Sequence, residues 1–346
     1  MDLAEFRLFA EHLPVADAMQ GEQDFAMPRE DALKAALAAF ETDQRRHLSL
    51  PLVHPDRQPL RFDWPAALKH FRILGSDKER TDEAFCVFDA LPWLGMKDAA
   101  CAFLATGQGQ AIYASERYLP EILDDHAALR RLPKGSFGQD YCDVMERDGL
   151  SAAGLIADFE AARGGRVRLD DKIEWYAERL RDTHDLLHVL TGFGRDVLGE
   201  QCVLTFVFGQ RPSIGHLFVG YAGALLTRLN TGWEVPVLRA VYEARQIGRT
   251  CLPIAEQPIH KLLAMPTDAV RARLGLRPAR HYPQAQRIWR ERGIDPKQVL
   301  VKSAASRLAL RVRWDCFSPS PCPCDRGSAH QVPQCAGVRG CLWRGP

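Results

Sequence analysis

The chain reads RDTHDLLH at residues 181–188, and Glu200 follows after eleven further residues. On a helix, His184 and His188 lie one turn apart on the same face, with Asp185 beside them. Two imidazoles and two carboxylates at this spacing form a ligand set for a divalent metal ion. This is the strongest chemical signal in the sequence, and it predicts a metal site made of His184, Asp185, His188 and Glu200.

The residues around the motif predict one long helix. Side chains of a core-facing stripe recur at steps of three and four residues, at Ile173, Tyr176, Leu180, Thr183, Leu187 and Leu190. The histidines lie on the adjoining face, at the edge of this stripe, where apolar side chains can wall a site. We expect residues 191–194 (TGFG) to end the helix, because glycine readily adopts the C-cap conformation.

A second helix is expected to follow, with Asp196 as its N-cap and Glu200 one turn inside it. Two helices joined by a short loop are usually antiparallel neighbours. Glu200 would then face the last turns of the first helix and complete the metal site.

The rest of the chain also reads as helical, without alternating strands or internal repeats. Asp63 before Trp64-Pro65 is typical of an N-cap with proline in the first turn. Further helices are expected at residues 29–40, 64–74, 81–91, 96–104, 119–132, 138–148, 150–163, 214–229, 235–247, 259–264 and 267–274. We therefore predict an all-α fold, a multi-helix globular bundle with the metal site between two adjacent helices.

The domain organisation is expected to have three parts. Residues 1–59 read as an N-terminal extension, and residues 60–285 as the helical domain. Residues 286–346 read as a C-terminal helix followed by a disordered tail rich in cysteine and proline. Cys322, Cys324, His330, Cys335 and Cys341 can be written as a zinc knuckle, but their irregular spacing makes this signal weak.

The composition bounds the functional class. With 346 residues, 46% hydrophobic and 26% charged, the chain is an ordinary globular protein of one large or two small domains. Its net charge of +1 is uneven: residues 302–346 hold seven Lys/Arg and two Asp/Glu, a net of +5, so residues 1–301 carry −4. Because this acidic body lacks a basic footprint, nucleic acid is not an expected partner.

The N-terminus, the apolar runs and the cysteines predict the location. No basic region precedes an apolar run, and acidic residues outnumber the single Arg7 over residues 1–24, so no secretory signal or transit peptide is expected. No uncharged apolar run reaches the roughly 20 residues that span a bilayer. Five isolated cysteines, Cys86, Cys101, Cys142, Cys202 and Cys251, read as reduced thiols of a cytosolic protein.

Alternative interpretations exist for the turn at residues 132–138 and for the metal motif. Residues 132–138 (LPKGSFG) make a tight turn in which Ser136 can cap the next helix; a phosphate-binding loop is the alternative, although the spacing fits no nucleotide motif. At the metal motif, a purely structural reading pairs Asp185 or Glu200 with Arg181 or Arg195. A zinc hydrolase is disfavoured, because aspartate is one methylene shorter than the general-base glutamate of His-Glu-x-x-His. That shortening makes Asp185 a ligand or a partner of a ligating histidine.

With its neighbours, the motif resembles the signature of the coenzyme Q (ubiquinone) biosynthesis protein four family. The resemblance rests on His184-Asp185-x-x-His188 with Glu200, on residues 176–183 and 190–199 around it, and on residues 132–141, 244–249 and 263–276. It covers about Arg61 to Pro278, roughly two-thirds of the chain.

This resemblance implies a helical protein that acts in ubiquinone synthesis, is cytoplasmic and is peripheral to the inner membrane. It implies a divalent metal, with Zn²⁺ expected, held by the matching His184, Asp185, His188 and Glu200. The implied reaction is that of a carbon–carbon lyase of the 4-hydroxy-3-methoxy-5-polyprenylbenzoate decarboxylase type, replacing the ring C1 carboxyl by a hydroxyl. His184, Asp185 and Arg181 are the expected catalytic residues, with Arg181 or Arg179 steadying a para phenolate.

The resemblance also implies partners. These are a polyprenylated ring substrate or prenyl lipid, other ubiquinone-biosynthesis enzymes and a membrane surface, and it leaves room for a homo-oligomer. A groove along the apolar stretch 214–229 is the expected place for the prenyl tail. The alternative is a non-catalytic lipid-binding scaffold that organises the ubiquinone-synthesis enzymes and uses the metal to hold its helices together.

Overall fold

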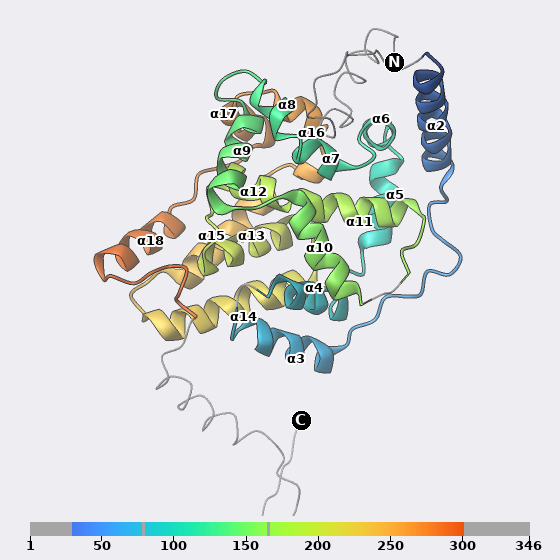
Figure 1. The fold of residues 1–346 in the computed structure, drawn as a ribbon. Coiled ribbons are helices and arrows are strands. Elements are labelled where there is room, and N and C mark those ends of the chain that lie inside the picture. The colour runs from blue at the N-terminus through green and yellow to red at the C-terminus, as the bar shows by residue number, and fades with distance from the viewer. Residues whose placement is uncertain (1–29, 78–79, 165–166, 301–346) are drawn as a thin grey trace, which may run out of the picture. The chain divides into compact units, whose positions relative to one another are not determined.

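The structure, a computed structural model, describes residues 30–77, 80–164 and 167–300, and within these ranges every regular element is a helix (Figure 1). The first half contains α2 Glu30–Ser49, α3 Trp64–Leu74, α4 Thr81–Ala90, α5 Met96–Leu104, α6 Gly107–Ser115, α7 Leu119–Leu123, α8 His126–Arg130, α9 Phe137–Asp148 and α10 Ala152–Arg163. The second half contains α11 Lys172–Asp182, α12 His184–Thr191, α13 Val197–Gln210, α14 Ile214–Thr231, α15 Val237–Thr250, the 3₁₀-helix η2 Ile254–Glu256, α16 Ile259–Leu263, α17 Thr267–Leu274 and α18 His281–Glu291. The predicted all-α class is confirmed.

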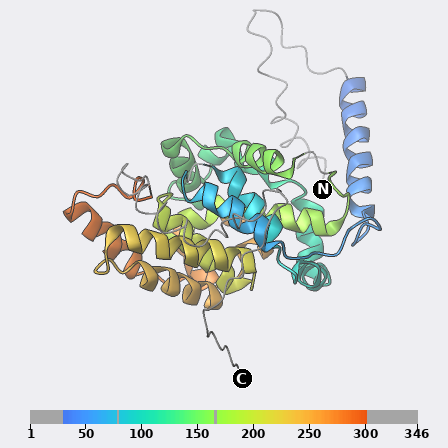
Figure 2. The same cartoon turned by 90° about the horizontal axis from the view of Figure 1, so that it is seen from below.

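Three helices, α13, α14 and α15, pack closely against one another (Figures 1 and 2). Glycine makes the close approach of α13 to α15 possible, since a Cβ on Gly248 would lie 2.1 Å from the Phe206 carbonyl oxygen. On the α14 side, a Cβ on Gly220 would lie 2.6 Å from the Thr205 methyl group. Helix α12 packs on α13, and this contact places the predicted metal ligands at the edge of the core.

The long helix expected through residues 173–190 is in fact two helices, α11 and α12, separated at Thr183. The Thr183 hydroxyl donates to the carbonyl oxygens of Arg179 at 3.0 Å and Leu180 at 3.2 Å, and such back-bonding competes with the helical ladder and bends helices. Buried apolar residues continue across the break, although Ile173 lies in a different hydrophobic cluster from Leu187 and Leu190. Because buried apolar residues continue past Thr183, the sequence pattern did not reveal the break between the two helices.

Other boundaries also differ from expectation. The single helix expected over residues 119–132 is two short helices, α7 and α8, because the Asp125 side chain caps a new start by accepting from the Ala128 N–H at 2.8 Å. Helix α18 crosses the expected domain boundary at residue 285. Its Tyr282 and Trp289 belong to the main hydrophobic core, so this helix is part of the body.

The segment expected as an N-terminal extension contacts the body in its later part, at His47 and Arg57. The His47 ring stacks on Tyr113 of α6 with centroids 4.1 Å apart. Further along, the Arg57 guanidinium donates to Asp171 at 2.7 Å and to Glu174 at 2.9 Å, at the start of α11. Residues 1–29 and the tail from residue 301, with its expected disorder and weak zinc knuckle, lie outside the described residues.

The turn at residues 132–138 has a structural role. The Ser136 hydroxyl accepts from the Gln139 N–H at 3.4 Å and caps α9, as expected. Ser136 also forms an isolated β-bridge with Pro266, and the Phe137 N–H donates to the Met265 carbonyl oxygen at 2.8 Å. These contacts attach the turn to the loop before α17, and they account for it without a phosphate ligand.

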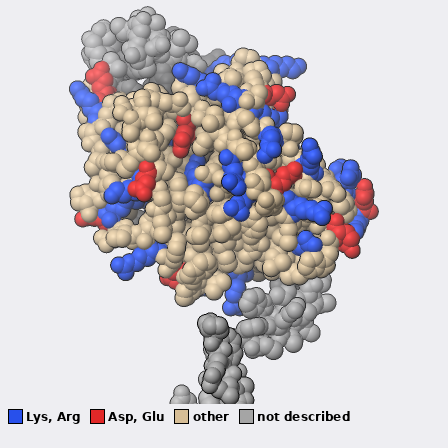
Figure 3. Space-filling model, turned by 180° about the vertical axis from the view of Figure 1, so that it is seen from behind, with Lys and Arg blue, Asp and Glu red and all other residues tan. Residues whose placement is uncertain are grey.

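The surface of the body is mixed in charge. On the face in Figure 3, Lys and Arg side chains are more widespread than Asp and Glu, and uncharged surface separates many of them. Among the described helices, none combines the length and apolar character needed to cross a bilayer. Among the cysteines of the described residues, Cys101, Cys142, Cys202 and Cys251 are free thiols.

Candidate metal site

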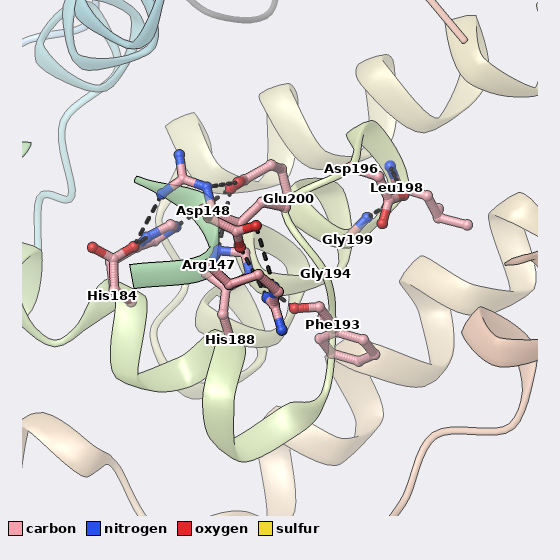
Figure 4. A network of polar contacts seen from close by, with 12 residues as sticks. Arg147, Asp148, His184, His188, Phe193, Gly194, Asp196, Leu198, Gly199 and Glu200 are labelled. Atoms are coloured by element: carbon pink, nitrogen blue, oxygen red, sulfur yellow. Dashed lines mark hydrogen bonds and ion pairs between the residues drawn. The ribbon is translucent and has the colours of Figure 1, made fainter. Parts of the chain in front are cut away.

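Helices α12 and α13 bring three of the four predicted ligands together. The Glu200 Oε2 atom lies 3.4 Å from His188 Nε2 and 3.7 Å from His184 Nε2 (Figure 4). One donor atom from each residue lies within 4.8 Å of the others, which is close enough for one ion to contact all three. His188 is buried, whereas the side chains of His184 and Glu200 are 26% and 32% exposed, so the group opens on one side.

The hydrogen bonds of the two imidazoles fix which nitrogen faces Glu200. His188 Nδ1 lies 2.9 Å from the Phe193 carbonyl oxygen, and His184 Nδ1 lies 3.3 Å from Asp185 Oδ1. Both partners can only accept, so both Nδ1 atoms are donors and both Nε2 atoms are left for the site. His188 Nε2 has no hydrogen-bond partner although it is buried. An outer acceptor on Nδ1 and an unpaired Nε2 are typical of a ligating histidine, so these residues fit a metal ion.

Asp185, the fourth predicted ligand, lies outside this group. Its Oδ1 atom faces His184 Nδ1, on the opposite side of the ring from Glu200, and it lies 3.5 Å from the Arg195 guanidinium. Adjacent residues of a helix point about 100° apart, so Asp185 cannot share the histidines' face. The arrangement matches the alternative in which the shorter carboxylate orients a ligating histidine.

Arg195 is the site residue that we did not select as functional from the sequence. Its guanidinium bridges the two carboxylates, with Nη1 3.5 Å from Asp185 and Nε 3.6 Å from Glu200 Oε1. Burial alone would raise the pKa of Glu200, but His188, His184 and Arg195 together lower it to about 2. From the sequence, Arg195 is expected only as a structural ion-pair partner, because the position of a loop residue cannot be predicted from helical periodicity.

The loop that carries Arg195 is held by a helix distant in sequence. Asp196 accepts from the N–H groups of Leu198 and Gly199, as predicted for the N-cap of α13. The Tyr282 hydroxyl of α18 donates to Asp196 Oδ2 at 2.5 Å and accepts from the Gly194 N–H at 2.8 Å. Gln286 donates to the other Asp196 oxygen at 2.9 Å. Helix α18 therefore fixes the loop between the two ligand-bearing helices.

Replacing Tyr282 by phenylalanine should lower the free energy of unfolding by about 1–3 kcal/mol, because the Asp196 carboxylate and the Gly194 N–H each lose a hydrogen-bond partner. It should also weaken zinc binding, because the loop that positions Arg195 and the Phe193 carbonyl loses an anchor. Urea unfolding and isothermal titration with zinc measure the two effects. Tyr242→Phe, at a tyrosine that is 55% exposed, is the matched control and should change neither.

The two arginines that precede the motif are bonded to groups other than His184, His188 and Glu200. Arg179 is buried and donates to Glu116 at 2.6 Å and to the Gln257 carbonyl oxygen at 2.7 Å. Arg181 donates to Asp182 at 2.7 Å, and its guanidinium lies over the Phe159 ring at 4.7 Å. Both arginines already have buried partners, so Arg195 is the arginine that contacts the group.

A surface pocket of about 430 Å³ adjoins the group, with His188 and Arg195 in its wall. Much of the remaining wall comes from α9, including Asp140, Asp143 and Arg147, and from the Gly192–Gly194 loop, and Val189 and Tyr282 also contribute. This volume lies within the usual range for small-molecule sites.

The metal-free protein should lose stability as pH rises above neutrality. Burial would lower the pKa of His188, but the Glu200 carboxylate outweighs it and raises that pKa above its ordinary value of 6.5. A raised folded-state pKa gives stability that is complete below the unfolded pKa and is lost as pH rises through the folded value. Thermal unfolding in chelator across pH 6–9 measures this loss. Zinc should offset it, whereas Glu200→Gln without metal should flatten the profile.

The chain is similar to proteins of one known family. A family model described as "Coenzyme Q (ubiquinone) biosynthesis protein Coq4" matches residues 95–280, which is more than half of the chain and includes all three ligands. The chain belongs to the Coq4 family. The family resemblance predicted from the motif is thus confirmed.

Curated Coq4 relatives are similar over part of their length. The COQ4 homologue of Bos taurus is 29% identical over 156 residues, which are 39% of this chain and 56% of that protein. COQ4 homologue 2 of Culex quinquefasciatus is 29% identical over 100 residues, which are 29% of this chain and 42% of that protein. Both relatives are named as mitochondrial. The chain spans about half the length of the curated relatives that it matches.

A crystal structure of a Nostoc punctiforme protein assigned to ubiquinone biosynthesis is also similar to this Coq4-family chain. Its sequence identity is 22% and the TM-score is 0.47, covering 62% of this chain and 99% of that one.

Proposed function

We propose that this Coq4-family chain is a metal-dependent enzyme of ubiquinone biosynthesis. Its reaction is C1 decarboxylation, coupled to hydroxylation, of a polyprenylated 4-hydroxybenzoate-type ring intermediate. The observation that carries the proposal is the convergence of His184 Nε2, His188 Nε2 and Glu200 Oε2, with both Nδ1 atoms already bonded to acceptors. A donor set of two imidazoles and one carboxylate is typical of catalytic zinc, with a position open for substrate.

When bound, the divalent ion supplies a Lewis acid for a carboxylate or phenolate oxygen. His184, His188 and Glu200 hold it, while Asp185 and the Phe193 carbonyl oxygen keep the rings oriented. Arg195 takes the role first expected of Arg181, since it lies in the pocket wall and can pair with an anionic substrate oxygen.

The bond changes follow from the substrate class. An electrophile adds at C1 as the para phenolate donates into the ring, carbon dioxide leaves, and the electron pair of the broken bond restores the aromatic phenolate. With a proton as the electrophile, the step is a simple decarboxylation. Replacing the carboxyl by a hydroxyl is a net two-electron oxidation, so that outcome requires an added oxidant such as dioxygen.

The prenyl tail and the inner-membrane surface are proposed to meet the outer face of α14. The glycine side of α14 is filled by α13, since a Cβ on Gly223 would lie 3.0 Å from the Gln201 amide. Leu225 and Leu229 remain 46% and 58% exposed on the other side. Exposed Trp64 of α3 lies nearby, packed edge-on against Phe218 of α14. An apolar face of this kind is a place where a lipid or membrane can bind.

Turnover of a short-tailed substrate tests the proposal. Purified protein loaded with zinc is incubated with 4-hydroxy-3-methoxy-5-prenylbenzoate labelled in the carboxyl group, with and without oxygen, and released labelled carbon dioxide is counted. Release should depend on metal and be lost in Glu200→Gln. His281→Ala, which changes a histidine outside the site, should keep the wild-type rate.

The second candidate is a metal-stabilised, lipid-binding scaffold for the other ubiquinone-biosynthesis enzymes. It is favoured by the fact that the three ligands join α12 to α13, so an ion there would hold the helices together. Metal-loaded protein that releases no carbon dioxide under any of these conditions, yet loses partner binding and stability when Glu200 is changed, would favour this scaffold.

A further inference from the structure

A second group of metal-binding side chains lies away from the α12–α13 ligands, between α8 and α9. It consists of His126, Cys142 and Glu146, and one donor atom from each lies within 4.8 Å of the others. Neither the proposed reaction nor its pocket uses these donors.

Local structure explains why the three side chains meet. Cys142 and Glu146 are four residues apart on α9, so they lie on one face of that helix. His126 is the first residue of α8, whose start is fixed by the Asp125 cap. Helices α8 and α9 pack against each other, and His126 Nδ1 lies 3.2 Å from Glu146 Oε1.

We propose that His126, Cys142 and Glu146 bind a thiophilic divalent cation of the Zn²⁺ type, separately from the α12–α13 site. Sulfur, nitrogen and carboxylate oxygen are three ligands that zinc accepts, and water can complete a tetrahedron. Mg²⁺ and Ca²⁺ are poor candidates, because they prefer all-oxygen ligands. The ion would tie α8 to α9 beside the turn that caps α9.

The charges around the group are balanced once an ion is bound. Arg130 donates to Glu146 Oε2 at 2.7 Å and to Asp143 Oδ1 at 2.6 Å. It therefore holds the Glu146 carboxylate from one side and leaves Oε1 directed at His126. The two charges of the ion are matched by the Cys142 thiolate and Glu146, while Arg130 is matched by Asp143. An outer partner that orients a ligating carboxylate is a common feature of metal sites.

Access and protonation are also suited to an ion. The side chain of Glu146 is 51% exposed and that of His126 is 26% exposed, so an ion can enter from solvent. The Cys142 sulfur is buried, and burial raises the pKa of its thiol, so ion binding must displace a proton. Occupancy is then expected to increase with pH.

Cobalt substitution separates the two sites, because only this one contains sulfur. The full chain, with its tail cysteines Cys316, Cys322, Cys324, Cys335 and Cys341 changed to serine, is titrated with Co²⁺ and followed by absorption. We expect a thiolate-to-cobalt charge-transfer band whose absorbance reaches its maximum at one equivalent of Co²⁺. Cys142→Ser on this background should abolish the band, and the matched control Cys101→Ser should keep it. His188→Ala should also keep it, so failure of the proposed enzymatic function would leave this result unchanged.

A variant at an exposed position tests the site without changing a buried residue, so misfolding cannot explain its effect. Glu146→Gln keeps the sulfur and alters a side chain that is half exposed, and it should weaken cobalt binding in the charge-transfer band at least tenfold. The proposal is overturned if the parent shows no band, if the band survives Cys142→Ser, or if Glu146→Gln binds as tightly as its parent. In each of those cases His126 and Glu146 form an ion pair only.

Discussion

Replacing His188 by alanine should remove one equivalent of bound zinc from the purified protein. The His188 ring is the buried member of the group, with Nδ1 bonded to the Phe193 carbonyl oxygen and Nε2 lying 3.4 Å from Glu200 Oε2. Losing an outer partner of a metal ligand usually costs 10–100-fold in affinity, so losing the ligand itself should cost more than that. Metal analysis after dialysis and competition with a chromophoric chelator measure the change.

Two further variants make this result specific. His188→Gln keeps a polar side chain of similar length but removes the imidazole, so it tests whether alanine acts only by leaving a cavity. His281→Ala is the control, at a histidine of α18 whose Nδ1 lies 3.4 Å from the Gln284 side-chain oxygen. Unchanged zinc content in both His188 variants would contradict the assignment of the α12–α13 site.

The second large effect is expected at the buried ion pair of Arg179 and Glu116. Both side chains are almost fully buried, and Glu116 also accepts from the His260 N–H at 2.9 Å. Glu116→Gln leaves the guanidinium facing a neutral amide. Breaking one partner of a buried pair typically costs about 3–5 kcal/mol, because the remaining charge is buried without compensation. Urea unfolding followed by circular dichroism measures the loss.

An exposed ion pair supplies the comparison. Asp170→Asn removes the partner of Arg46, whose side chain is 71% exposed, and should cost at most about 1 kcal/mol. The double variant Glu116→Leu/Arg179→Met should recover part of the loss, because no unpaired charge then remains. If Glu116→Gln instead keeps full stability but abolishes turnover, Arg179 acts in the reaction and its structural assignment is wrong.

The meeting of His184, His188 and Glu200 could be predicted from the sequence because it depends on local rules. Helical spacing placed His184 and His188 on one face, and the cap residues Gly192 and Asp196 fixed where one helix ends and the next begins. A short loop between two capped helices left few ways for Glu200 to point. All-helical architecture followed from the same periodicity.

The features that were not predicted depend on contacts between distant residues. Arg195 faces the carboxylates because Tyr282, 86 residues beyond Asp196, holds its loop. The roles of Arg179 and Arg181 depended on Glu116 and Phe159, which no spacing rule relates to the motif. The direction of Asp185, in contrast, could have been predicted. Adjacent residues of a helix point about 100° apart, so Asp185 could not lie on the face of His184 and His188.

The anchoring of Asp196 by α18 also bears on how such proteins should be divided for study. The segment shared with the family ends at residue 280, one residue before α18 begins. A fragment trimmed to that segment would keep every proposed ligand of the α12–α13 site and still lack Tyr282, Gln286 and the buried Trp289. The segment recognised by sequence similarity is therefore shorter than the segment that must fold together. Poor folding of a trimmed fragment would say nothing about the chemistry of the intact chain.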